Sequence, residues 1–497
     1  MFPRAAERHL WAGRAFTLIA VLSIIRLGVL LFSGIANGEA YYEMWSRFPA
    51  WSYYDHPPLL AWITWAVTQI SAAPAAVRAT AVVCSVFSQI LLYRLASRMF
   101  NPRTGFLAVL LLATIPAFFF SAFILNPEAP LLPLWLGFLL ALNGMRGRDE
   151  AWRPLALGAV IGLAFLAKYT GVLGVVSTAI YLAWSPSGRR WLTRPSLYMG
   201  GLVALALAIP VIAWNYQNGW PTINLHFVER AAPLTLAIAA ANVVKIIGGQ
   251  WGAFHPLLFP AMVAMIGVSY RLSKTDDRYR MLVATSVPLL LFFFLAMIRV
   301  RDSESHWTMV AFIPLIIALA AFWDRTSAKP SVRRFFAVAV GAAAIAYSFA
   351  MAHFVTPKLV PLIPARLYDA NQDVANELTD WPRIGSIIAR HAAERPGVVI
   401  ASTQYALCAK IMFEMNDAPN IYCPTERRSQ FDFIGRHDIP ASAPVLFVND
   451  SHYPDTPEMR LPNRRCTPSE TISVDRGGVH VRDYNLYDCS PASPALR

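Results

Sequence analysis

Long apolar stretches recur along the first two thirds of the chain, separated by short polar connections. A helix needs about 20 apolar residues to cross a bilayer, and about eleven stretches reach or approach that length: residues 15–36, 75–97, 104–122, 129–145, 155–167, 170–184, 196–214, 256–271, 281–298, 307–323 and 333–353. This pattern predicts a polytopic α-helical membrane protein. The first stretch lacks a small-residue cleavage site, so we expect it to be retained as a span.

Two shorter apolar sections do not fit this series of spans. Residues 59–70 contain Trp62 and Trp65, and we expect them to form an amphipathic helix in the plane of the membrane interface. For residues 237–252 we expect another interfacial or re-entrant helix. A lipid substrate would enter past such segments.

The composition supports the membrane class. Of 497 residues, 56% are hydrophobic and only 15% are charged, whereas a soluble globular protein carries about 25% charged residues. The net charge of +13 raises nucleic-acid binding as an alternative. We exclude that alternative, because the basic residues do not form a tract and because cytoplasmic loops of membrane proteins collect Lys and Arg.

The basic residues also predict the orientation in the membrane. Every second connection between apolar stretches is basic: Arg98 and Arg103; Arg146, Arg148 and Arg153; Arg189, Arg190 and Arg194; Arg271, Lys274, Arg278 and Arg280; Arg325, Lys329, Arg333 and Arg334. By the positive-inside rule these connections and the N-terminus face the cytoplasm. An odd number of spans then places the C-terminal region on the opposite, outer side of the membrane.

The composition changes after Val355 and divides the chain into a transmembrane domain, residues 1–356, and a soluble domain, residues 357–497. In the second domain, helix patterns at 381–394 and 405–415 alternate with strand patterns at 397–402, 420–423, 443–450 and 478–488, which predicts a small α/β fold. Its four cysteines are an even number in a domain expected outside the cytoplasm, so they are disulfide candidates, with four reduced thiols as the alternative: Cys408, Cys423, Cys466 and Cys489.

Unusual ionisable residues gather in the connections predicted to face outward. They include Glu39, Asp55, His56, Glu128, Lys168, Arg230, Arg299, Arg301 and His306. Ionisable groups at a membrane are costly and are usually paired and functional, so we expect a site on the outer face. The alternative is that these loops are simply polar. Taken singly, Lys168 is either a snorkelling lysine or a cation for a lipid phosphate, which Lys binds as a point charge.

Several motifs resemble one known family. The segments GEAYYEMWSR and YYDHPPLLAW, then NPEAPLLPLW, AKYTGVL, WNYQNGWPTINLHFVER and SHWTMVAFIPL, occur in the order found in GT-C class polyprenyl-phosphate-sugar glycosyltransferases. They are most similar to bacterial relatives of protein O-mannosyltransferases and of the lipid A aminoarabinose transferase. The resemblance covers roughly residues 15–325 and implies a GT-C type fold with periplasmic juxtamembrane helices.

The resemblance also implies a reaction. A carboxylate in the first outer loop takes a proton from the acceptor, which attacks the anomeric carbon of a polyprenyl-phosphate-linked sugar with inversion, while cations stabilise the leaving lipid phosphate. The implied donor-binding residues are Tyr41, Tyr42, His56, Glu128, Lys168, Tyr169, Arg230, Arg299, Arg301 and His306. The expected partners are that donor, an envelope glycan, lipid or protein acceptor, and membrane lipids. No cofactor is required, and a divalent metal at Asp55 is left open.

One departure from the family falls on the presumed base. The family usually has Asp-Glu where this chain has Gly38-Glu39. Glu39 is our first choice for the catalytic carboxylate and Asp55 the second, with Glu128 as a further option. Two other functions remain open: a non-catalytic glycolipid-binding protein, which Gly38 favours, and a lipid-linked sugar transporter or flippase. The sequence identifies neither the sugar nor the acceptor.

Overall fold

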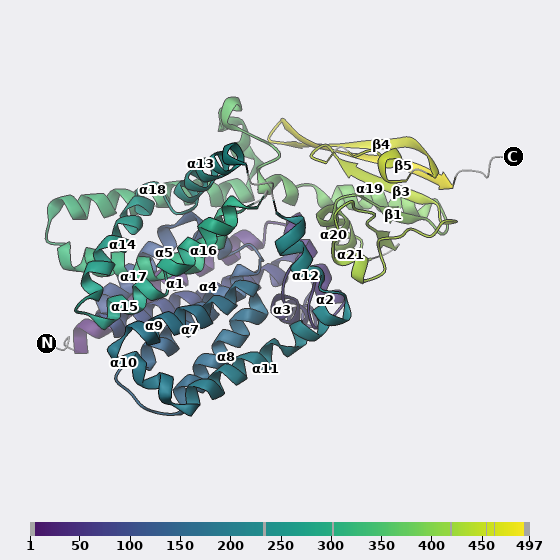
Figure 1. Cartoon of the computed structure of the whole chain (residues 1–497). Helices are drawn as coiled ribbons and strands as arrows, with labels where there is room; N and C mark the ends of the chain where they lie inside the picture. Colours follow the sequence, from purple (N-terminus) through teal and green to yellow (C-terminus); the bar gives the residue numbers. More distant parts are fainter. Residues whose placement is uncertain are drawn as a thin grey trace. The chain divides into compact units, whose positions relative to one another are not determined.

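A computed structural model describes residues 5–231, 235–300, 303–417, 420–453, 455–461 and 463–491 (Figure 1). The chain forms two compact units. The first contains Met1–Leu27, His56–Leu60 and Thr80–Tyr347, and the second contains Gly28–Asp55, Ala61–Ala79 and Ser348–Arg497. The second unit therefore combines most of the first outer loop with the C-terminal domain.

Helices make up the first unit (Figure 1). They are α1 (Ala5–Leu30), α4 (Pro74–Met99), α5 (Pro102–Thr114), α6 (Pro116–Ser121), α7 (Glu128–Gly144), α8 (Trp152–Ala167), α9 (Leu173–Trp184), α10 (Pro186–Arg189), α11 (Pro195–Gln217), α12 (Pro221–Asn224), α13 (Leu236–Ala253), α14 (Leu258–Ser273), α15 (Asp277–Ala284), α16 (Val287–Ile298), α17 (Met309–Thr326) and α18 (Pro330–Val355). Short helical turns η1 (Tyr169–Val172), η2 (Arg190–Thr193), η3 (Leu225–Glu229) and η4 (Ser305–Thr308) connect some of them. Helices α1, α4 and α18 also have residues in the second unit.

Among the described residues, seven helical segments are long and apolar enough to cross a membrane, if α15 and α16 count as one segment and η4 and α17 as another: Ala6–Leu30, Pro74–Met99, Pro195–Gln217, Leu236–Ala253, Asp277–Ile298, Ser305–Thr326 and Pro330–Val355. Six further apolar helices have 10–17 residues. The expected membrane-helix architecture is therefore confirmed, whereas the expected number of about eleven spans stays a prediction. Residues 237–252, expected to be interfacial or re-entrant, lie in α13, which has the length and composition of a span.

Two of the predicted continuous helices are broken in the structure. The stretch 104–122 divides at Ile115 into α5 and α6, and the stretch 281–298 divides at Thr285 and Ser286 into α15 and α16. Pro116 begins α6, and Pro288 is in the first turn of α16. Because proline has no N–H to donate and its ring clashes with the preceding turn, each proline ends the helix before it.

The core of the first unit surrounds α17, which is buried on nearly every side from Met309 to Ala321. A helix that is apolar all round belongs in the interior of a bundle. On another part of the bundle, α8 and α11 approach closely at two glycines. A Cβ atom added to Gly158 would lie 1.8 Å from the carbonyl oxygen of Gly200, so this crossing requires glycine.

The second unit contains helices α2 (Asn37–Arg47) and most of α3 (Leu59–Thr68), together with a mixed sheet in the order β2-β1-β3-β5-β4. The strands are β1 (Val399–Ala401), β2 (Ile421–Tyr422), β3 (Val445–Asp450), β4 (Arg464–Arg476) and β5 (Val479–Pro491). Strand β1 is parallel to β2 and β3, whereas β5 is antiparallel to β3 and β4. The unit also contains helices α19 (Trp381–Ala393), α20 (Tyr405–Glu414), α21 (Gln430–Phe433) and α22 (Pro457–Arg460), and the short helical turns η5 (Pro357–Leu362), η6 (Ala365–Leu367) and η7 (Val374–Leu378).

Strand β4 is an element that the sequence pattern does not predict. It contains Pro468 and is mostly polar, and buried residues alternate with exposed ones only in its last part, at Ile472, Val474 and Arg476. The ladder to β5 accommodates the proline with an irregularity between Pro468 and Glu470. The hairpin between β4 and β5 turns at Gly477 and Gly478, with φ of 62° and 79°, which are values that glycine adopts readily.

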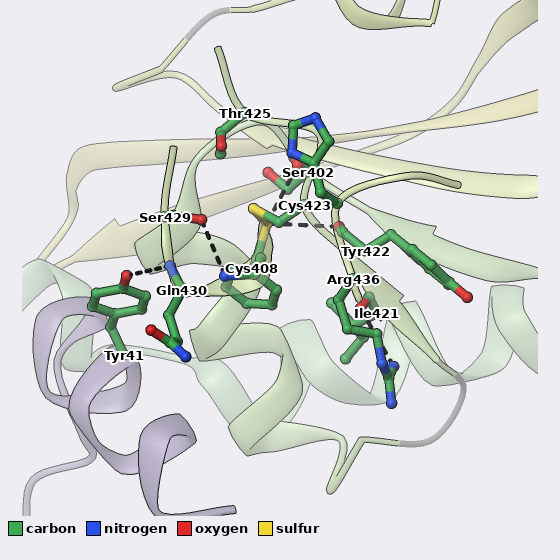
Figure 2. Close-up of a disulfide and its surroundings, with 12 residues drawn as sticks. Tyr41, Ser402, Cys408, Ile421, Tyr422, Cys423, Thr425, Ser429, Gln430 and Arg436 are labelled. Atoms are coloured by element: carbon green, nitrogen blue, oxygen red, sulfur yellow. Dashed lines mark hydrogen bonds between the residues drawn. A yellow bond between two sulfur atoms is a disulfide. The ribbon is translucent and has the colours of Figure 1, made fainter. Parts of the chain in front are cut away.

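Both pairs of C-terminal cysteines are joined in the structure. Cys408 in α20 is bonded to Cys423, which follows β2, and Cys466 is bonded to Cys489 directly across the β4–β5 ladder. The first disulfide is shown in Figure 2. Because a disulfide constrains the unfolded chain, each bond should stabilise this small domain.

Candidate functional site

A buried cluster in the first unit joins three residues that lie far apart in the sequence. Glu128 begins α7, Lys168 follows the last residue of α8, and His306 lies in η4 directly before α17. The Lys168 ammonium group forms an ion pair with the Glu128 carboxylate, and Nε2 of His306 lies 3.2 Å from Oε1 of the same carboxylate. The Glu128 side chain is only 3% exposed, so its charge depends on these two partners.

The local backbone explains why Lys168 leaves its helix at this point. Lys168 adopts an extended conformation, and its carbonyl oxygen accepts a hydrogen bond of 2.8 Å from the N–H of Gly171. A Cβ atom on Gly171 would lie 2.3 Å from the carbonyl carbon of Ala164. Glycine at 171 therefore permits the tight turn that directs the chain from α8 into η1.

His56 belongs to the same cluster. Burial lowers the pKa of His56 well below its usual value, and the charges of Lys168, His226 and Arg230 lower the pKa further, while Glu128 raises it. The imidazole ring is therefore neutral at neutral pH. Pro57 and Pro58 follow it and keep the backbone extended.

Other sequence-predicted residues surround this cluster. The hydroxyl of Tyr169 donates a hydrogen bond of 3.3 Å to Thr222, and its ring lies 5.7 Å from the ring of His226. The guanidinium group of Arg230 lies over the ring of Trp307 at 5.9 Å.

The two remaining predicted cations are not part of the cluster as described. Arg299 is exposed after the last residue of α16, and within the described ranges it forms no salt bridge. Arg301 lies outside the described residues. Its expected contact with lipid phosphate therefore stays a prediction.

In the second unit, Asp55 is held by groups on two sides. The hydroxyl of Tyr41 donates a hydrogen bond of 2.8 Å to Oδ2 of Asp55, and Nη2 of Arg427 lies 3.1 Å from Oδ1. Burial, and then the charge of Asp55, raise the pKa of Tyr41 well above its usual value, so Tyr41 remains a donor. The ring of Tyr42, the next residue, lies 5.0 Å from the ring of Trp45.

Glu39 is held differently, in a buried ion pair within the second unit. Nε of Arg78 lies 3.0 Å from Oε1 of Glu39, and both side chains are 1% exposed. The backbone N–H of Ala36 donates to the other carboxylate oxygen at 3.0 Å. Arg78 also donates to Ser33 and to the carbonyl oxygen of Gly34. Both oxygens of Glu39 are therefore engaged in holding the chain between α1 and α2.

The sequence allows a divalent metal at Asp55, but the groups around Asp55 do not suit a metal ion. Tyr41 and Arg427 occupy its two carboxylate oxygens, and a metal there would lie beside the Arg427 cation. Across the ranges that the structure describes, no three His, Cys, Asp or Glu side chains are grouped so that they could hold a metal ion.

Sequence reasoning missed the partners of the two first-loop carboxylates. Arg78 lies in an apolar stretch, where a lone arginine signals a buried partner, so this contact had a detectable signal. Arg427 and Gln430, which contacts Tyr41, lie in the C-terminal domain and have no motif that marks them.

Comparisons with known proteins show which proteins this chain resembles. A family model described as dolichyl-phosphate-mannose-protein mannosyltransferase matches residues 55–214. A lipid A galacturonosyltransferase, RgtD of Rhizobium johnstonii, is 28% identical over 279 residues, which are 55% of this chain and 58% of the relative. The match thus spans less than two thirds of that relative.

Solved structures show the fold. The crystal structure of ArnT from Cupriavidus metallidurans bound to undecaprenyl phosphate matches with a TM-score of 0.65 and 15% identity, covering 95% of this chain and 98% of that one. The apo form of the same protein matches with a TM-score of 0.63. The chain therefore has an ArnT-like fold, and its resemblance to the GT-C class of membrane glycosyltransferases is confirmed.

Proposed function

We propose that this protein transfers a sugar from a polyprenyl phosphate to an acceptor on the periplasmic side of a bacterial inner membrane. The observation that carries the proposal is the buried cluster of Glu128, Lys168 and His306. Lys168 supplies a cation at this cluster, and an incoming anion would be attracted to it. Lys168 would bind the lipid phosphate as a point charge, with His306 and His56 as hydrogen-bond partners.

The carrier is the part of the proposal that the fold supports best. ArnT has been crystallised with undecaprenyl phosphate, and this chain has a similar fold along nearly its whole length. Helices with the length and composition of membrane spans are present to accommodate a polyprenyl chain. The proposal retains a cytoplasmic N-terminus, about eleven spans and a periplasmic domain over residues 357–497.

In the proposed transfer, negative charge develops on the phosphate that leaves the sugar. An acceptor hydroxyl attacks the anomeric carbon, and the bond between that carbon and the phosphate oxygen breaks with its electron pair remaining on the phosphate. Lys168 stabilises this growing negative charge, which makes its effect larger in the transition state than in the bound donor. A carboxylate accepts the acceptor proton, and attack from the opposite face inverts the anomeric centre.

We assign the role of proton acceptor to Asp55 rather than to Glu39. Both carboxylates have hydrogen-bond partners on both oxygens, but the Asp55 side chain is 14% exposed, whereas the Glu39 side chain is only 1% exposed. A general base must come within hydrogen-bond reach of the proton that it removes. Glu39 could do so only by leaving Arg78 buried and unpaired, which is costly.

The relative that matches in sequence suggests the sugar and the acceptor. RgtD is a lipid A galacturonosyltransferase, so we propose a galacturonosyl group as the sugar and lipid A or its attached glycan as the acceptor. A mass profile of envelope glycolipids from a strain that lacks this protein tests both assignments. We expect the species carrying galacturonic acid to disappear, and to return with the wild-type chain but not with Lys168→Ala. A glycolipid profile unchanged by the deletion would contradict the proposal.

A non-catalytic glycolipid-binding role is the second candidate. Gly38, which replaces the family's presumed base, and the buried ion pair of Glu39 both favour it. Multiple turnovers by the purified protein would exclude this candidate, whereas tight donor binding without transfer would support it.

A further inference from the structure

A short segment of the C-terminal domain reaches the carboxylate that we assign as the proton acceptor. Residues 423–430, named here the 423–430 segment, follow β2 and end at the start of α21. Two of its residues contact the first outer loop within the second unit. Arg427 contacts Asp55 directly, and Gln430 contacts Tyr41, which in turn donates to Asp55.

The contacts fix both oxygens of Asp55. Tyr41 from α2 donates to Oδ2 at 2.8 Å, and Arg427 lies 3.1 Å from Oδ1. The backbone N–H of Gln430 donates to the Tyr41 hydroxyl oxygen at 2.9 Å, which orients its proton toward Asp55 (Figure 2 shows Tyr41 and Gln430). The carboxylate thus has a defined direction, set partly by the loop and partly by the C-terminal domain.

The 423–430 segment is attached to other parts of the second unit at both of its ends. The Cys408–Cys423 disulfide, shown in Figure 2, joins its first residue to α20. The N–H of Cys423 donates to the carbonyl oxygen of Arg436 at 2.7 Å. At the other end, Oε1 of Gln430 accepts a hydrogen bond of 2.9 Å from the backbone N–H of Tyr54, the residue before Asp55.

Arg427 is less enclosed than the carboxylate that it contacts. Its side chain is 42% exposed, and its guanidinium group lies over the ring of Tyr405 at 5.9 Å. A partly exposed pair contributes little to folding stability, commonly about 0–1 kcal/mol. The main effect of this contact is therefore to orient the Asp55 carboxylate rather than to stabilise the fold.

We propose that the 423–430 segment positions Asp55 for the reaction, with Arg427 as the positioning residue. This inference rests on the proposed function of Asp55. It gives the C-terminal domain a part in catalysis, because a domain outside the membrane helices then sets the direction of the general base. Arg427 does not touch the reacting atoms in this account; it acts through Asp55.

The test compares Arg427→Ala with Arg428→Ala in the full-length protein in nanodiscs. Arg428 is the neighbouring arginine, is exposed and carries the same charge, so it is a matched control. Steady-state transfer from a polyprenyl-phosphate galacturonic acid donor is measured for both. We expect kcat to fall about 10- to 100-fold in Arg427→Ala, as for a catalytic group displaced by about 1 Å, with KM for the donor changed less than threefold.

Two further variants separate positioning from a general loss of structure. Arg427→Lys keeps the charge and can reproduce a single contact to Oδ1, so we expect at least half of the wild-type kcat. Guanidinium ion at low millimolar concentration should restore part of the activity of Arg427→Ala. No rescue by either, or a loss in Arg428→Ala equal to that in Arg427→Ala, would overturn the inference.

A second measurement does not depend on catalysis. Hydrogen exchange read by mass spectrometry should show faster exchange of peptides covering residues 48–58 in Arg427→Ala than in Arg428→Ala. Equal exchange in the two variants would overturn the positioning role even if transfer is observed. Wild-type protein that transfers no sugar, with the exchange difference still present, would instead refute the proposed function and leave the Arg427 contact standing.

Discussion

Arg78 and Glu39 form an ion pair in which Nε lies 3.0 Å from Oε1 and neither side chain is more than 1% exposed. The pair connects the first turn of α2 to α4 and, through Ser33 and Gly34, to the end of α1. A carboxylate held in this way is suited to fixing the first outer loop. It is poorly suited to exchanging protons with a substrate.

The role of Glu39 can be separated from catalysis by replacing the pair. Glu39→Gln should lower stability by about 3–5 kcal/mol, because Arg78 is left as an uncompensated buried charge, whereas Glu39→Met with Arg78→Met should recover most of it. Thermal unfolding of the purified variants measures this. The double variant should also retain transfer activity. A well-folded double variant without any activity would show that Glu39 takes part in the chemistry.

Replacing Gly38 by aspartate tests whether the acidic residue usual in the resembled family can act as the base in this chain. A Cβ atom at Gly38 meets nothing within 4 Å, and Gly38 lies in the first turn of α2, where an acidic side chain interacts favourably with the helix dipole. We expect Gly38→Asp to fold with stability equal to or up to about 1 kcal/mol above the wild type. In an Asp55→Asn background it should restore measurable transfer, with Gly38→Ala as the inactive control. Restoration by Gly38→Ala as well would contradict this interpretation.

The crossing of α8 and α11 predicts a stability effect that is independent of function. Gly158→Ala should destabilise the protein, because the new methyl group would overlap the carbonyl oxygen of Gly200. Gly201→Ala is the matched control, since a Cβ atom there meets nothing within 4 Å. Unfolding temperature in detergent is the measurement. Equal temperatures for the two variants would refute the close approach of the helices.

His56 predicts a pH dependence. Burial lowers its pKa in the folded protein below the usual 6.5, so the unfolded chain binds a proton more readily. The contribution of neutral His56 is complete above pH 6.5 and is lost as the pH falls from there toward the folded pKa, by at most about 1.4 kcal/mol per pH unit. The pH dependence of unfolding between pH 7.5 and 5 should therefore be shallower in His56→Gln. The wild-type slope retained in His56→Gln would contradict the prediction.

The sequence was most informative where a pattern repeats or a motif is long. Apolar periodicity predicted the membrane class, and the order of short motifs predicted the resemblance to the GT-C class, which the comparisons confirm. The charges expected on one face include Glu128, Lys168 and His306, and the structure brings these three into contact. The apolar pattern predicted continuous helices at Pro116 and Pro288, where the structure has breaks, because it counts hydrophobic residues and does not register the local effect of a proline.

Contacts between distant segments were beyond the reach of sequence patterns. Arg427 lies 372 residues from Asp55, and no periodicity relates the two. Strand β4 pairs along its length with β5, and its own sequence is mostly polar. Its sequence therefore did not predict a strand, because the pairing with β5 determines its structure. The choice between Glu39 and Asp55 likewise depends on burial, which a single sequence does not contain.

The most direct test of the account is sugar transfer by purified protein from a polyprenyl-phosphate galacturonic acid donor to lipid A, compared between wild type, Lys168→Ala and Lys245→Ala. Lys168 is the cation paired with Glu128, and Lys245 is an exposed lysine of α13. We predict turnover by the wild type and by Lys245→Ala, and a kcat at least about 100-fold lower in Lys168→Ala, the loss typical of removing one charge-stabilising group. Equal turnover by all three proteins, or none by the wild type, would contradict the account.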